Sequence, residues 1–177
     1  LTFFELNKRT TPEEITTFLQ PAENGNDMGL LSEAGCPGVA DPGAEIVKMA
    51  HERGIEVIPF VGPSSILLAL MASGMNGQGF SFQGYLSAKK PELAKDLTRL
   101  EQLAMKHRQT QIFIETPYRN MGMLEEAFKV LSPETRLCVA ADISLETEFI
   151  LTKKIKDWRK TKLPNLHKRP AIFLIQG

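Results

Sequence analysis

Cysteine, histidine and tryptophan are scarce in this chain of 177 residues, which contains two, three and one of them. Cys36 and Cys138 lie far apart in unlike contexts, so neither a disulfide framework nor a zinc site is indicated. His51, His107 and His167 are also far apart in the sequence and lack paired ligand residues. This spacing argues against a histidine-based metal site or catalytic triad. The sequence therefore predicts chemistry without a bound metal.

Net charge and long apolar runs are also missing. The chain has 21 basic and 21 acidic residues, and its formal net charge is zero. RNA-binding chains usually carry a basic excess, so the overall charge alone does not favour RNA as a partner. The apolar run at 66–71 is too short to span a bilayer. With 42% hydrophobic and 24% charged residues, the composition predicts one globular domain or two small ones, and we expect a cytoplasmic protein.

The most informative pattern lies between residues 28 and 43. An apolar segment, Met28–Leu31, precedes a loop of glycines and prolines that leads into a helix. Glycines such as Gly38 permit positive φ, and the prolines stiffen the loop. Asp41 is predicted as the N-cap, with Pro42 as the first helical residue. A strand, such a loop and a capped helix are typical of cofactor sites in α/β sheets, although a tight structural turn has the same composition.

The rest of the chain alternates between strand-like and helix-like periodicity, which predicts the α/β class. A capping box at Thr11–Glu14 predicts a helix that Pro21 ends. Residues 66–72 are apolar on every face, which predicts a fully buried helix. Further helices are expected at 43–53, 91–106 and 121–131, and strands at 28–31, 55–60, 80–85, 111–115, 136–140, 148–153 and 170–176.

One ordered series of motifs resembles a known family. Glu33–Gly43 reads Glu-Ala-Gly-Cys-Pro-Gly-Val-Ala-Asp-Pro-Gly, which is similar to the Asp-Ala-Gly-Thr-Pro-x-x-x-Asp-Pro-Gly signature of the tetrapyrrole-methylase-like methyltransferases that use S-adenosylmethionine (SAM). The closest branch methylates a ribose 2′-hydroxyl in small-subunit ribosomal RNA. Val61–Ser65, Phe82–Leu86 and Ile112–Arg119 resemble later motifs of the family in the same order.

The resemblance runs from about Leu30 to Gly177 and implies a two-lobe α/β fold. Residues 1–60 then form the C-terminal part of an N-terminal lobe, and residues 61–177 form the C-terminal lobe. The family has a glycine-rich strand-turn and a strand–helix unit upstream of this point. We therefore expect a fragment with a truncated N-terminal lobe, which binds SAM weakly, and lobes that meet near Phe60–Pro63.

The resemblance also implies SAM as the cofactor, in a cleft between the lobes. Hydroxyls and N–H groups at the start of the 66–72 helix suit the carboxylate of SAM, although a serine there also serves as a simple helix cap. A buried final strand would resemble the adenine-lining segment equally well. The cofactor-binding residues implied by the resemblance are Glu33, Ala34, Gly35, Cys36, Pro37, Ser64, Ser65, Pro170 and Ala171.

Methyl transfer to a hydroxyl needs an acceptor in line and a base that takes its proton. Glu115 and Asp142 match the two acidic positions of the family and are the candidate catalytic residues. A solvated strand end and an ordinary loop carboxylate are the alternative interpretations. Arg119 matches a family arginine and is predicted to bind a substrate phosphate or carboxylate, unless it pairs with Glu115 or Glu126.

Departures from the family affect the acceptor. Where the ribosomal RNA branch has Ala-Arg-Glu-Leu-Thr-Lys, residues 140–145 lack both basic residues, so phosphate binding there is lost. The basic stretch 153–169 contains Trp158, and it either follows an RNA backbone with an aromatic ring for stacking or is a solvated face. The prediction is RNA ribose 2′-O-methylation in ribosomal RNA processing. The alternatives are methylation of a tetrapyrrole or other small molecule, and a SAM-binding dimerisation module without turnover.

A homodimer is the expected assembly, because the resembled family pairs through its lobes. Methionine and aromatic residues, which are enriched at interface centres, surround the glycine-rich connection 74–79. The alternative is that they fill the core of the second lobe. These residues are Met71, Met75, Phe80, Phe82 and Tyr85.

Overall fold

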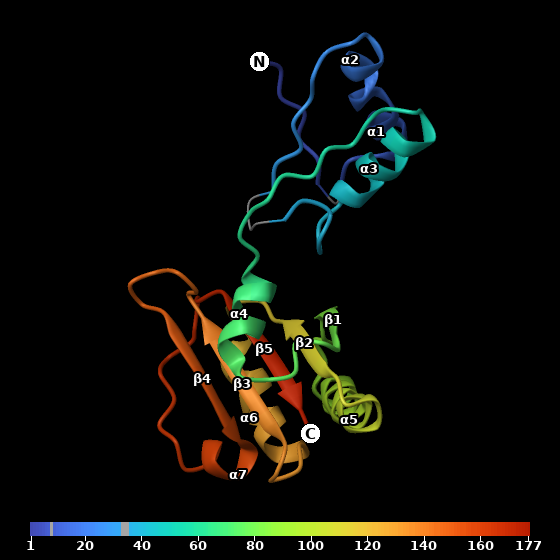
Figure 1. Ribbon diagram of the computed structural model, residues 1–177. Coiled ribbons are helices and arrows are strands. Elements are labelled where there is room, and N and C mark those ends of the chain that lie inside the picture. The colour runs from blue at the N-terminus through green and yellow to red at the C-terminus, as the bar shows by residue number, and fades with distance from the viewer. Residues whose placement is uncertain (8, 33–35) are drawn as a thin grey trace. The chain divides into compact units, whose positions relative to one another are not determined.

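The computed structural model describes residues 1–7, 9–32 and 36–177 (Figure 1). The chain divides into two compact units, Leu1–Ser64 and Ser65–Gly177, which we call the first and second units. The assignment of 1–60 and 61–177 to two methylase lobes stays a prediction.

The first unit contains three helices, α1 (Pro12–Phe18), α2 (Gln20–Glu23) and α3 (Gly43–Glu52). The capping box that begins α1 is confirmed: Glu14 N donates to Thr11 Oγ1 at 3.3 Å, and Thr11 N donates to Glu14 Oε2 at 2.8 Å. Pro21 does not end the helical segment, because it lies in the first turn of α2. The N–H groups of a first turn have no partner within the helix, so a proline there loses no hydrogen bond. Arg53 links the helices through Glu23 Oε1 at 2.8 Å and a backbone carbonyl of α1 at 2.9 Å.

The strands predicted at 28–31 and 55–60 are wrong. None of the described residues of the first unit belongs to a strand, and the two segments are irregular. Their large apolar side chains are mostly exposed, with Leu31 at 86%, Ile58 at 65% and Phe60 at 93%. Alternating apolar residues produce a strand when a neighbouring strand supplies hydrogen-bond partners, and no such ladder exists in the described part of this unit.

The second unit contains a five-stranded sheet of β1 (Phe80–Tyr85), β2 (Thr110–Ile114), β3 (Arg136–Ala141), β4 (Phe149–Lys154) and β5 (Ala171–Gln176). The strand order is β1-β2-β5-β3-β4. β1 and β2 are parallel, and every other neighbouring pair is antiparallel. Because β5 runs against both β2 and β3, the ends of β1, β2 and β3 meet at one edge with the starts of β4 and β5. We call this the carboxyl edge.

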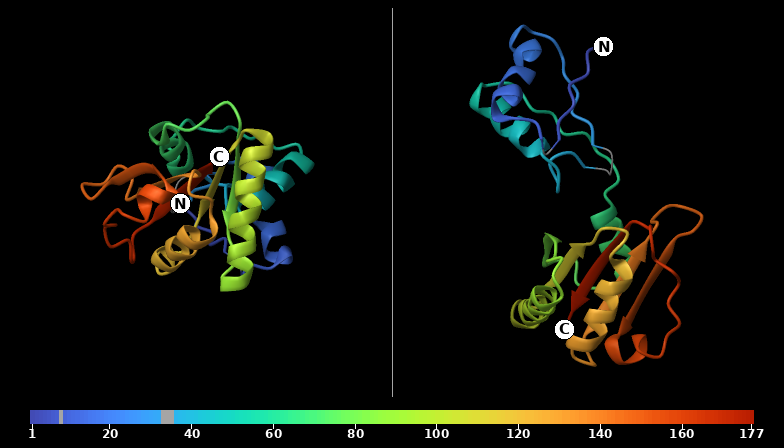
Figure 2. Two further views of the ribbon diagram at one scale, coloured as in Figure 1. Left: turned by 90° about the horizontal axis from the view of Figure 1, so that it is seen from below. Right: turned by 180° about the vertical axis from the view of Figure 1, so that it is seen from behind.

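Helices cover both faces of the sheet, which confirms the predicted α/β class. The helices are α4 (Ser65–Ser73), α5 (Lys90–His107), α6 (Asn120–Val130) and α7 (Ile155–Trp158). Figure 1 shows α4 in front of the sheet, and the rear view in Figure 2 shows α6 over the opposite face. Phe113 and Phe173 face α5 and α6 with ring centroids 5.5 Å apart, whereas Ile112 and Leu174, next to them in sequence, pack with the α4 face. Strand periodicity thus separates two cores.

The prediction that the 66–72 helix is buried on every side is wrong. In α4, Ala69 and Leu70 are buried against the sheet, but Leu67 is 48% exposed and Met71 is 79% exposed. A helix laid on one sheet face buries one stripe, however apolar its other positions are. Met75 and Phe82 pack against the same core. For these two residues the structure agrees with the alternative that they fill the core, rather than with a role in an interface. Of the helices in the described ranges, none combines the length and apolar character needed to cross a membrane.

Candidate functional site

The loop before α3 is held by one carboxylate. Asp41 Oδ1 accepts hydrogen bonds from Gly38 N and Gly43 N, both at 2.7 Å. The helix begins at Gly43 with Pro42 as its N-cap, one position later than predicted, yet Asp41 still satisfies an N-terminal N–H group. A Cβ atom at Gly43 would lie 2.8 Å from Asp41 Oδ1 and 2.9 Å from Gly38 N. The loop is therefore a tight structure that requires glycine at 43.

The same loop contacts the end of the first unit. The Cys36 thiol lies 3.8 Å from the carbonyl oxygen of Pro63, so it donates a weak hydrogen bond to it. Cys36 and Pro37 thus lie in a loop that contacts the residue before Ser64, although these segments are far apart in the sequence. Glu33, Ala34 and Gly35 lie outside the described residues. The structure joins the described part of the predicted SAM loop to the segment that contains Ser64.

Glu115 directly follows β2 at the carboxyl edge, and its side chain is 1% exposed. Oε1 accepts from Thr116 N at 2.6 Å, and Oε2 forms an ion pair with Arg119. The Arg119 guanidinium also donates to the carbonyl oxygens of Leu86 at 3.4 Å and Ser87 at 3.2 Å. Glu115 is therefore a buried carboxylate and not a solvated strand end, and the pairing alternative for Arg119 is observed.

Asp142 directly follows β3 and is held in a similar way. Its side chain is 7% exposed, and Oδ2 accepts from Arg169 Nε at 2.6 Å and Thr147 Oγ1 at 2.7 Å. Arg169 also donates to the carbonyl of Thr147, and Asp142 N donates to Pro170 O at 3.0 Å. Sequence reasoning missed Arg169 because it is one of many cations in the basic stretch. Its position directly before Pro170 and Ala171 was the available signal.

The sheet register brings these residues to the same edge. Ile114 pairs with Ile172, and Ala141 pairs with Ala171, so the start of β5 lies between the ends of β2 and β3. Glu115 and Asp142 therefore flank Pro170 and Ala171, and two strand spacings place their backbones about 10 Å apart. Ser65, the remaining predicted site residue of this unit, is the first residue of α4.

Each carboxylate has an arginine partner, so these two ion pairs together add no net charge to the carboxyl edge. The hydrogen bonds differ in one respect. Both oxygens of the Glu115 carboxylate accept hydrogen bonds. Within the described residues, the hydrogen bonds that the Asp142 carboxylate accepts all go to Oδ2. Asp142 Oδ1 is therefore better placed than either oxygen of Glu115 to accept a proton without losing an existing partner.

The basic stretch 153–169 was given two interpretations, and the structure excludes the one in which Trp158 stacks on RNA bases. Trp158 is 1% exposed, its Nε1 donates to Leu137 O at 2.8 Å, and its ring stacks on Phe128 with centroids 6.2 Å apart. Lys154 and Lys156 both pair with Glu134, at 2.7 and 2.6 Å. Hydrogen bonds from these lysines lower the pKa of Glu134 from 4.5 to about 2. Stacking on Trp158 is wrong, because the ring is part of the core.

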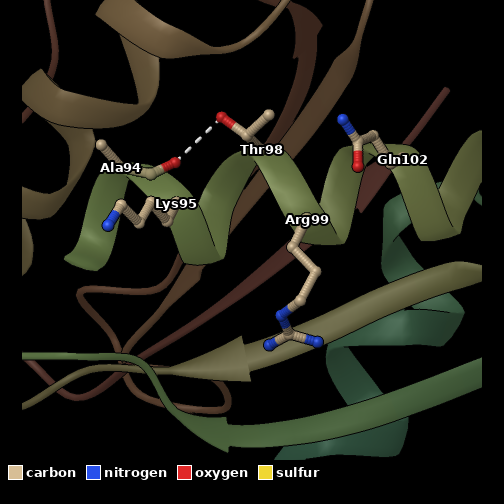
Figure 3. A pocket seen from close by; sticks show the side chains of 5 residues that line it. All are labelled: Ala94, Lys95, Thr98, Arg99 and Gln102. Atoms are coloured by element: carbon tan, nitrogen blue, oxygen red, sulfur yellow. Dashed lines mark hydrogen bonds between the residues drawn. The ribbon is translucent and has the colours of Figure 1, made fainter. Parts of the chain in front are cut away.

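A shallow hollow lies along the outer face of α5 (Figure 3). One helix supplies all of its lining residues, so it has a single wall, and no predicted site residue lines it. Its lining residues are Ala94, Lys95, Thr98, Arg99 and Gln102. Within the part of the chain that the structure describes, no group of three or more His, Cys, Asp or Glu side chains is arranged to hold a metal ion.

The chain matches the family model of the Tetrapyrrole (Corrin/Porphyrin) Methylases over residues 5–158. Ribosomal RNA small subunit methyltransferase I of Haemophilus influenzae is 33% identical over 177 residues, which cover 99% of this chain and 61% of that protein. The protein of the same name from Pseudomonas aeruginosa is 34% identical over 168 residues, which cover 93% of this chain and 58% of that protein. The chain thus spans about three fifths of the length of these relatives.

Solved structures show the same fold. The methyltransferase CobJ matches 93% of this chain and 70% of its own with a TM-score of 0.62 at 18% identity. Uroporphyrin-III C-methyl transferase from Thermus thermophilus, complexed with S-adenyl homocysteine, matches 95% of this chain and 74% of its own with a TM-score of 0.53 at 16% identity. At these identities the likeness establishes the architecture alone, and it confirms the predicted fold.

Proposed function

Because this chain belongs to the tetrapyrrole (corrin/porphyrin) methylase family, we propose that it is a SAM-dependent methyltransferase, or the part of one, that acts on a ribose 2′-hydroxyl of ribosomal RNA. The names of its relatives support ribosomal RNA as the acceptor. The observation that carries the proposal is the carboxyl edge, where Glu115 and Asp142 flank Pro170–Ala171.

The residues present fit SAM in chemical type. In the first unit, Cys36, Pro37 and Ser64 belong to two segments that contact each other. Close packing around Gly43 fixes the conformation of the loop that contains Cys36 and Pro37. In the second unit, Ser65 begins a helix, and Ala171 is an apolar residue at the start of β5, 7% exposed, of a type that suits the neighbourhood of an adenine. The proposed set is completed by Glu33, Ala34, Gly35 and Pro170. When bound, SAM supplies an electrophilic methyl group on a sulfonium.

We propose Asp142 as the base that accepts the proton of the ribose hydroxyl. Thr147 and Arg169 fix Oδ2 and so orient Oδ1. Glu115 then acts by positioning Arg119, which we propose as the group that binds a substrate phosphate. Arg119 is 34% exposed in its side chain, so part of the guanidinium is accessible while the rest is held by Glu115 and the β1 end.

The test is a methylation assay with SAM and small-subunit ribosomal RNA from a strain that lacks the modification. It should use both this chain and any longer protein that contains it. Mass spectrometry of the digested RNA should show a nucleoside methylated on its ribose. Methyl transfer to a porphyrin but not to RNA would favour the small-molecule alternative, and SAM binding without turnover on any acceptor would favour a binding module.

We also propose a cytoplasmic homodimer. Met71, Phe80 and Tyr85 are 79%, 40% and 57% exposed in one unit, which supports an interface there. Association should bury roughly 800 Å² on each partner. Light scattering at tens of micromolar should report twice the chain mass, whereas a monomer at that concentration would contradict the dimer.

A further inference from the structure

An aromatic pair lies next to the carboxyl edge. Tyr118, in the connection between β2 and α6, contacts His167, in the segment before β5. The ring centroids are 5.5 Å apart in an edge-to-face arrangement of 73°. Tyr118 is 68% exposed and His167 is also exposed, so most of the tyrosine ring is open to solvent. We call Tyr118 and His167 the aromatic platform.

Three hydrogen bonds between the two segments that carry the rings fix the platform in place. Asn120, which is fully buried, donates from Nδ2 to the carbonyl oxygens of Leu166 at 3.1 Å and Arg169 at 2.7 Å. Lys168 N donates to Pro117 O at 3.0 Å, which links the two segments that carry the rings. His167 is therefore held against Tyr118 from both sides, and little ordering is needed when a ligand stacks there.

The charges around the platform favour the binding of a polyanion, but only weakly. Lys168 is exposed and directly follows His167. Arg119 and Arg169 flank the platform in sequence, but each is paired with a carboxylate. The local excess of positive charge therefore comes from Lys168, so stacking must supply most of the affinity.

We propose that the aromatic platform stacks on one base of single-stranded RNA, with Lys168 near the adjoining phosphate. This inference rests on the proposed RNA function and specifies how RNA is bound. A single open ring matches the size of one nucleobase better than that of a tetrapyrrole macrocycle, and stacking accepts any base because every base has a π-face. It places the nucleotide next to Asp142 and Glu115, the residues proposed for the reaction.

The experiment is fluorescence anisotropy of this chain with a labelled short oligouridine at low salt. Tyr118→Ala should lower the affinity about tenfold, in the range that one stacked base contributes. Tyr118→Phe should retain it, because the ring remains. An abasic oligonucleotide with the same phosphates should bind wild type and Tyr118→Ala equally. The matched control is Phe3→Ala, which removes an 82% exposed ring of the first unit that belongs to no proposed site and should change nothing.

Three results would overturn the platform: no binding of oligouridine by wild type, equal binding by Tyr118→Ala, or an equal loss on the abasic oligonucleotide. If Tyr118→Ala weakened the binding of a porphyrin but not that of RNA, the platform would be assigned to the small molecule instead. Circular dichroism of each variant checks that it folds. Base stacking without RNA methylation would refute the proposed function alone, whereas RNA methylation without dependence of binding on Tyr118 would refute the platform alone.

Discussion

Replacing Arg119 with methionine removes the cation that neutralises a carboxylate that is 1% exposed. Breaking a buried ion pair from one side costs about 3–5 kcal/mol, because the remaining charge is left without a partner. The Arg119 side chain is 34% exposed, so water reaches Glu115 partly and the lower end, about 3 kcal/mol, is expected. With a urea m-value of about 1–3 kcal/mol/M, the unfolding midpoint should fall by roughly 1–3 M.

Urea unfolding followed by fluorescence measures this loss, since Trp158 is the sole tryptophan and is buried in the same unit. The matched control is Arg99→Met, which breaks a 3.6 Å ion pair between side chains 51% and 30% exposed and should cost less than about 1 kcal/mol. Adding Glu115→Gln to Arg119→Met should recover much of the lost stability. Equal midpoints for Arg119→Met and wild type would refute the argument that Glu115 depends on its arginine.

Three further predictions concern stability and titration. Gly43→Ala should destabilise the first unit by about 1–3 kcal/mol in thermal melting, because its Cβ would meet Asp41 Oδ1 and Gly38 N, whereas Gly29→Ala, with open space around it, should not. Glu101→Ala should cost about 1–3 kcal/mol in urea unfolding, since this buried carboxylate accepts from Ser132 N at 2.8 Å and from the Thr135 hydroxyl; a loss below about 0.5 kcal/mol would contradict it. The Glu134 carboxyl has a lowered pKa of about 2, so its ion pairs should contribute fully to the folding stability above pH 4.5. That contribution should be lost as the pH falls through about 2, and an NMR titration that gives Glu134 an ordinary pKa would disprove the pairing.

The central strands of the second unit could be predicted because a sheet covered on both faces gives short, nearly continuous apolar runs. Phe113 and Ile112 face opposite cores, and both positions are apolar in the sequence. The alternation of apolar residues at 55–60 failed as a strand signal, because a strand also needs a pairing partner, which local sequence cannot supply. For α4, uniform apolarity could not reveal that one stripe packs and the other is exposed.

The candidate site was predictable in part. Glu115, Arg119 and Asp142 came from the family resemblance, but the partner of Asp142 did not. The pairing of β3 with β5 brings Arg169 to Asp142, and spacing along the chain carries no record of that pairing. The contact between Tyr118 and His167 arises in the same way, from β2 pairing with β5. Both interpretations of the basic stretch took Trp158 as accessible, because the surrounding lysines do not reveal that the ring is buried.

Mass spectrometry of methylated RNA from matched variants tests the proposed chemistry most directly. The chain, or a longer protein that contains it, is incubated with SAM and unmodified small-subunit ribosomal RNA. A methyl group on a ribose is expected with wild type, with a loss of at least about a hundredfold in rate for Asp142→Asn and a smaller loss for Glu115→Gln, since general bases contribute about 10²–10⁴-fold. Methylation that is absent from wild type, or that Asp142→Asn leaves unchanged in a folded protein, would contradict the assignment.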